Sequence, residues 1–160
     1  MTDHHFDLPA KHTVLRSFAG HLDASPDDVY PLLVARLIPG DEAGGHMLTD
    51  PDARLVIVEG DWWYRAEYRV RPEQTAQGAD TGAGADAGAD ADAGEGVGAA
   101  SEPAATEDRG GSVVEFEIIN VAQKAHWAGA ITARSVVQNA PAAFGRLLTE
   151  LDEQLSASDS

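Results

Sequence analysis

A long segment of low complexity interrupts this chain and limits how the rest of it can fold. Residues 74–111 contain twelve Ala, nine Gly and eight acidic residues, and their only large aliphatic residue is Val97. Such a segment cannot bury enough apolar surface to offset the entropy that is lost on ordering. We therefore expect a disordered, acidic insert within a single domain over residues 8–157, whose ordered blocks are 8–73 and 112–157.

The charge and the absence of cysteine exclude several classes of function. The 160 residues carry a formal net charge of −16, and none of them is cysteine. A surface this negative is expected to repel nucleic acid and anionic lipid headgroups, which attract Lys and Arg. Without cysteine there is no disulfide, thiol nucleophile or thiolate metal site. No apolar run is long enough to span a membrane and no secretory signal is recognisable, so we expect a cytoplasmic protein.

The first ordered block begins with a strand and a capped helix. Residues 12–23 are predicted to form a strand. Val14 is expected on its apolar face, together with the two apolar residues that lie four and eight positions later. Ser25 is the predicted N-cap of the following helix and Pro26 its first residue. An apolar stripe along this helix indicates a buried face. Residues 41–51, after the helix, are predicted to be a loop.

Two segments of alternating polarity flank the insert. In residues 62–71 and again in 112–122, apolar or aromatic side chains alternate with charged ones, as in half-buried strands. If the two strands pair as a hairpin, the arginines of one outer face meet the glutamates of the other, and the insert becomes the hairpin tip. Trp63 falls on the charged face. It either marks a contact with a partner or is covered by the Arg65 side chain.

The chain is predicted to end in a strand and a long helix. Residues 127–134 alternate once more, which predicts a further strand. Asn139 is the predicted cap of the C-terminal helix, with Pro141 in its first turn. From Phe144 to Leu155 the helix carries an apolar stripe at helical spacing, with Arg146 and Glu150 assigned to its wet side. The fold class is therefore α+β, with an antiparallel sheet and a C-terminal amphipathic helix.

Two short segments resemble a known superfamily. LDASPDDVYPLL (residues 22–33) resembles the opening of the SRPBCC or START-like superfamily of polyketide cyclases and lipid-transport proteins, and AFGRLLTELDEQL (residues 143–155) resembles its closing helix. The resemblance implies a helix-grip fold, in which a curved antiparallel sheet wraps around the long C-terminal helix and leaves an apolar cavity. Members bind or carry lipids and other apolar small molecules, some cyclise or aromatise polyketides, and some act on other proteins.

The inner face of this grip supplies the candidate ligand-binding residues. Apolar walls with a few hydroxyl, indole and amide groups are typical of small-molecule pockets. The candidates are Trp62, Tyr64, Tyr68, Phe116, Ile118, Asn120, Phe144, Leu147, Leu148 and Leu151. The same side chains are also what a solid core would contain, so the sequence leaves both interpretations open.

Candidates for catalysis are few. His126 is a possible acid or base because imidazole titrates near neutral pH, and Tyr64 and Tyr68 are the other candidates. We expect no metal site and no cofactor. The favoured hypothesis is binding or transport of an apolar small molecule, lipid or polyketide-like. The alternatives are a cyclase or aromatase enzyme, and a protein-interaction module with a filled core.

Overall fold

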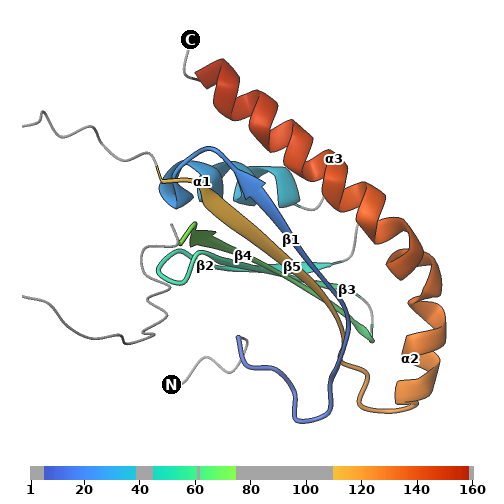
Figure 1. The fold of residues 1–160 in the computed structure, drawn as a ribbon. Helices are drawn as coiled ribbons and strands as arrows, with labels where there is room; N and C mark the ends of the chain where they lie inside the picture. Colours follow the sequence, from blue (N-terminus) through green and yellow to red (C-terminus); the bar gives the residue numbers. More distant parts are fainter. Residues whose placement is uncertain (1–5, 39–44, 61, 75–109, 159–160) are drawn as a thin grey trace, which may run out of the picture. The chain divides into compact units, whose positions relative to one another are not determined.

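The described residues on both sides of the insert contribute to one antiparallel sheet. The structure is a computed structural model that describes residues 6–38, 45–60, 62–74 and 110–158, so the predicted disordered insert lies almost entirely outside the described residues. The sheet has five strands in the order β1-β5-β4-β3-β2, and a C-terminal helix packs on it (Figure 1). This confirms the α+β class. None of the described helices is long and apolar enough to cross a membrane.

The two strands that flank the insert pair as predicted. β4 (Tyr64–Pro72) and β5 (Ser112–Asn120) are antiparallel neighbours, and Pro72 lies opposite Ser112 at the base of the insert. On the inner face, Tyr68 stacks on Phe116 with ring centroids 4.5 Å apart and an interplanar angle of 9°. The alternation of the two segments therefore sets the register in which the aromatic side chains meet.

The outer face of this hairpin carries the predicted pairs of opposite charge. Arg69 lies opposite Glu115, and Arg71 Nε is 2.9 Å from Glu115 Oε2. Arg65 is only 1% exposed, because its guanidinium group donates to Glu67 and to the backbone carbonyls of the N-terminal segment. Residues 6–7 thus cover part of the face that the sequence predicts to be wet.

The first strand and helix form as predicted. β1 (Thr13–Leu22) pairs with β5, and α1 (Pro26–Leu37) follows it. The Ser25 hydroxyl accepts a hydrogen bond of 3.2 Å from the backbone N–H of Asp28, which satisfies a free donor at the start of α1. The predicted place of Val14 is wrong. A β-bulge between Val14 and Arg16 shifts the facing of the strand and leaves Val14 44% exposed.

The predicted loop at 41–51 is wrong for its second half. β2 (His46–Asp50) is an edge strand that pairs with β3 (Leu55–Gly60), from His46 opposite Glu59 to Asp50 opposite Leu55. β2 has only two large apolar side chains among its five residues, so its sequence carries little strand signal. Pairing with the buried strand β3 is what makes it a strand.

The predicted strand at 127–134 is a helix. α2 (His126–Thr132) lies at the end of the sheet and leads directly into α3 (Arg134–Ser158). Trp127 and Ile131 are four residues apart, a spacing that places two side chains on one face of a strand and also on one face of a helix. The residues between them are Ala, Gly and Ala, which lack the β-branched side chains that favour strands.

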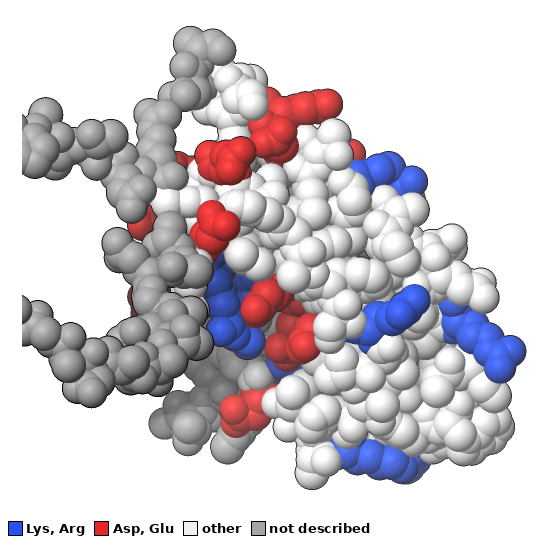
Figure 2. Space-filling model, in the orientation of Figure 1, with Lys and Arg blue, Asp and Glu red and all other residues white. Residues whose placement is uncertain are grey.

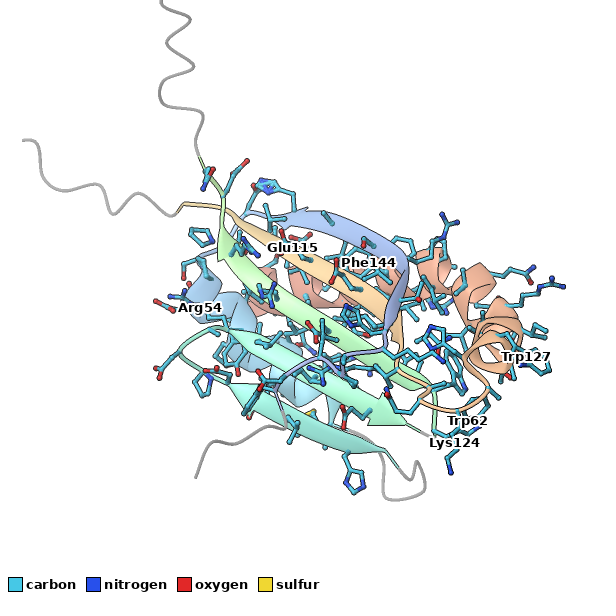
Figure 3. The ribbon with its side chains drawn as sticks, turned by 90° about the horizontal axis from the view of Figure 1, so that it is seen from below. Arg54, Trp62, Glu115, Lys124, Trp127 and Phe144 are labelled. Atoms are coloured by element: carbon cyan, nitrogen blue, oxygen red, sulfur yellow. The ribbon has the colours of Figure 1, made fainter. Side chains whose placement is uncertain are left out.

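The C-terminal helix begins earlier than Asn139. α3 starts at Arg134, Pro141 lies inside it, and its backbone bonds begin with Val137 N donating to Ala133 O over 2.8 Å. It packs on the same face of the sheet as α1, and both helices lie behind the sheet in the view of Figure 3. Phe144 of α3 is the centre of this contact, with its ring centroid 5.5 Å from that of Phe116.

The two tryptophans before β4 differ in exposure from what their sequence positions predict. Gly60 of β3 lies opposite Tyr64, so β4 begins only at Tyr64. Trp62, expected on the inner face, is 53% exposed. Trp63, expected on the charged face, is 5% exposed and packs against Ala122 and Ala133. Trp63 is therefore covered within the protein and does not mark a contact with a partner.

Candidate functional site

A cavity of about 510 Å³ lies between the inner face of β4 and β5, the C-terminal end of α1 and one side of α3. Its volume is within the range of ligand pockets in proteins. Aromatic and aliphatic side chains form most of its wall: Leu37, Tyr64, Tyr68, Phe116, Ile118, Val136, Ala140, Ala143, Phe144 and Leu147. The space between sheet and helix is therefore packed at its centre by Phe144 and open on the side of this cavity.

Polar side chains from α1 and α3 complete the lining. They are Arg36, Ser135, Asn139, Arg146 and Glu150. The Arg36 Nε–H donates to Glu150 and forms an ion pair that joins the two helices. This hydrogen bond holds the pKa of Glu150 below its ordinary value and raises the pKa of Arg36. The apolar cavity thus has a charged rim with two arginines and one glutamate.

Two tyrosine hydroxyls are the polar groups of the aromatic wall. Burial raises the pKa of Tyr64, and burial together with the neighbouring Tyr64 raises the pKa of Tyr68 strongly. Both phenols therefore stay protonated and act as hydrogen-bond donors. Among the described residues, neither hydroxyl has a hydrogen-bond partner, so both are free to bind an acceptor atom in the cavity.

The structure divides the predicted ligand-binding residues into two groups. Six of the ten line the cavity: Tyr64, Tyr68, Phe116, Ile118, Phe144 and Leu147. The other four do not. Trp62 is exposed, Asn120 is fully buried elsewhere, Leu151 is fully buried in the core, and Leu148 packs over Gly20 of β1.

Asn120 and His126 hold the connection between β5 and α2. The Asn120 Nδ2–H donates to His126 O over 2.8 Å, and Asn120 Oδ1 accepts from Ala122 N over 3.1 Å. The His126 Nδ1–H donates to Ala122 O over 2.8 Å, while His126 Nε2 is 2.9 Å from Thr13 Oγ1. Neither side chain lines the cavity. Their geometry is that of a structural junction, and His126 has no access to a molecule bound there.

Sequence reasoning misses the polar part of the lining. Asn139, Ala143, Arg146 and Glu150 are spaced by four, three and four residues, which places them on one face of α3. This spacing is visible in the sequence. Arg146 is exposed, as its assignment to the wet side predicts. The assignment of Glu150 overlooks that Arg36 of α1 forms an ion pair with it.

Comparison with known proteins gives no relative from which a function can be transferred. No family model, no curated protein and no solved structure matches the chain. Among the described residues, no group of three or more His, Asp or Glu side chains has the geometry to hold a metal ion. The cavity is therefore the best guide to function.

Proposed function

We propose that the protein binds or carries an apolar small molecule, lipid or polyketide-like, in the cavity between the sheet and α3. One observation carries this proposal. About 510 Å³ of open space is bordered mostly by aromatic and aliphatic side chains, beside the buried core around Phe144. A recess of this volume with mostly apolar walls and a few polar groups is typical of small-molecule sites.

The architecture supports a place in the SRPBCC or START-like superfamily. A strand and a capped helix open the domain, antiparallel strands follow, and a long helix closes it. β1 pairs with the last strand, β5, and α3 packs across the inner face of the sheet. This arrangement is compatible with the helix-grip fold that the sequence resemblance implies.

The lining indicates how such a ligand is held. The apolar body of the ligand packs against the stacked rings of Tyr68 and Phe116 and against Leu147, where burial of apolar surface provides the affinity. An oxygen atom of the ligand accepts a hydrogen bond from Tyr64 or Tyr68, which fixes its orientation. Lipids and polyketides both combine an apolar body with oxygen acceptors.

A cavity-filling substitution on α3 tests this proposal. Ala142 and Ala143 are both exposed, but only Ala143 lines the cavity. A phenyl ring at position 143 would occupy part of the cavity. Ala143→Phe should therefore weaken binding of the uncharged apolar probe N-phenyl-1-naphthylamine, measured by its fluorescence, by about tenfold, which corresponds to about 1.4 kcal/mol. Ala142→Phe is the matched control and should bind the probe as the wild type does.

Native mass spectrometry of the same proteins with long-chain fatty acids provides a second measurement. Bound fatty acid should be seen with the wild type and with Ala142→Phe, and be reduced with Ala143→Phe. If the wild type binds neither the probe nor any fatty acid, or if Ala143→Phe binds them equally well, the cavity is not the ligand site.

A further inference from the structure

We infer that the end of the molecule formed by α2 and the β3–β4 turn is a docking surface for an anionic lipid bilayer. Two of the three tryptophans of the chain are exposed at this end: Trp62 in the turn (53%) and Trp127 on α2 (71%). Figure 3 shows both, together with Lys124, at the same end of the molecule. Among the described residues, six large hydrophobic side chains are exposed, and Trp62, Trp127, Ile131 and Val14 of β1 are four of them.

The segments that carry these exposed side chains are held by buried contacts. Trp63, next to Trp62, is buried against Ala122 and Ala133, and its carbonyl accepts a hydrogen bond of 2.8 Å from Val121 N. On the other side, Asn120 holds the first turn of α2 through its bond to His126 O. Trp62 and Trp127 are thus presented to solvent by a well-packed scaffold. Tryptophan is enriched where proteins meet the membrane–water interface, because its ring is apolar and its N–H is polar.

The charges around this surface have the sign that an anionic bilayer attracts. Residues 118–149 form a stretch of 32 residues with no Asp or Glu, in a chain that has 27 acidic residues, and it contains Lys124 and Arg134. Lys11 lies beside this stretch, since its carbonyl accepts a hydrogen bond from Gln123. In Figure 2 the acidic side chains gather away from α2, and the region over α2 shows only Lys, Arg and uncharged residues.

Two acidic residues are close to this surface in the sequence. Asp61 precedes Trp62, and Glu59 lies at the end of β3. The carboxylate of Glu59 is paired with Arg65 Nη1 at 3.2 Å, which offsets its charge. The other acids of the chain contribute to the net charge of −16, but salt screens charges beyond about 8–10 Å at physiological ionic strength. A basic, aromatic end on an acidic protein therefore predicts a defined orientation on the membrane.

A protein partner fits this surface less well than a lipid bilayer does. Trp127 and Ile131 are exposed on a short helix of seven residues, whereas protein interfaces bury closely complementary surfaces. The docking surface also adjoins the cavity. Tyr64 and Val136 line the cavity and pack against the Trp63 cluster beneath α2. The inference itself does not require that the cavity binds a ligand.

Vesicle binding by the full chain tests this inference. We expect the wild type to sediment with vesicles of equimolar phosphatidylcholine and phosphatidylglycerol, to bind pure phosphatidylcholine more weakly, and to show a blue shift of tryptophan emission. The double variant Trp62→Ala/Trp127→Ala should lose binding to both. Each cation near an anionic membrane strengthens binding about fivefold, and Lys124→Glu changes the charge by two units, so it should weaken binding to the anionic vesicles about 25-fold.

Two controls separate this surface from the rest of the molecule. Ile38→Ala removes a hydrophobic side chain that is 62% exposed outside the docking surface, and Arg71→Glu reverses a charge on the outer face of the sheet. Both should bind vesicles as the wild type does, with folding of every variant checked by circular dichroism. Absence of vesicle binding by the wild type at physiological ionic strength would overturn the inference, as would unchanged binding by the double tryptophan variant. If the wild type does not bind vesicles but forms a dimer in light scattering, and the double tryptophan variant is a monomer, the surface binds a second copy of the chain instead.

Discussion

Substitution of Gly129 by alanine should destabilise the protein, although alanine is the better helix former. A Cβ atom at Gly129 would lie 2.6 Å from Asn120 Oδ1 and 2.9 Å from Asn120 Nδ2. Asn120 is fully buried, and its two hydrogen bonds to His126 O and Ala122 N hold it in place. The new methyl group can therefore be accommodated only if the Asn120 side chain moves and both bonds are lost.

The magnitude follows from these contacts. Each buried polar group that loses its hydrogen bond costs about 1–3 kcal/mol, so two bonds cost about 4 kcal/mol. Replacement of Gly by Ala inside a helix by itself raises the free energy of unfolding by about 1 kcal/mol. The free energy of unfolding should thus fall by about 3 kcal/mol, and the melting temperature by roughly 10–15 °C for a domain of this size.

Urea unfolding followed by circular dichroism measures this change, and Gly145 provides the control. Nothing lies within 4 Å of a Cβ atom at Gly145, which is exposed on α3. Gly145→Ala should therefore raise the free energy of unfolding by about 1 kcal/mol. In the double variant Gly129→Ala/Asn120→Ala the two losses should not add, because both remove the same hydrogen bonds. A Gly129→Ala protein as stable as the wild type would refute this account of Asn120.

Two further predictions concern the two faces of β4. Arg65→Met should lower the free energy of unfolding, measured by urea titration, by about 3 kcal/mol, because the buried carboxylate of Glu67 loses its partner at 2.8 Å and keeps only Arg69 at 3.9 Å. Arg65→Met/Glu67→Leu should recover most of this loss, and a harmless single substitution would contradict the burial of the pair. The raised pKa values of Tyr64 and Tyr68 predict a stability that is complete below about pH 10 and lost as the pH rises further, because the unfolded chain ionises first. Tyr68→Phe should therefore show a smaller fall of the urea midpoint between neutral and alkaline pH, and an unchanged fall would argue against burial of this phenol.

Local patterns were sufficient for the elements that flank the insert. Alternation over residues 62–71 and 112–122 predicted a hairpin, and the observed pairing of Tyr68 with Phe116 follows from it. The N-cap at Ser25 was equally clear, because capping depends on side chains within a few residues of the helix start. Six of the ten predicted ligand-binding residues line the cavity, since facing within a strand or helix is itself a local property.

The errors arose where local signals are ambiguous. Trp127 and Ile131 fit the period of a strand as well as that of a helix, and Pro141 resembled the start of a helix that begins at Arg134. Trp62 and Trp63 differ only in which side of a turn they occupy. In each case the outcome depends on contacts with residues far away in the sequence.

Periodicity in the chain alone therefore established an α+β protein with an interrupted antiparallel hairpin and an amphipathic C-terminal helix. Tertiary packing alone decided that Arg65 is buried beneath the N-terminal segment, that Asn120 supports α2, and that Arg36 of α1 meets Glu150 of α3 at the cavity rim. The physical reason is that the direction of a side chain is set by its own backbone. Its burial and its partners are set by which distant element packs against it.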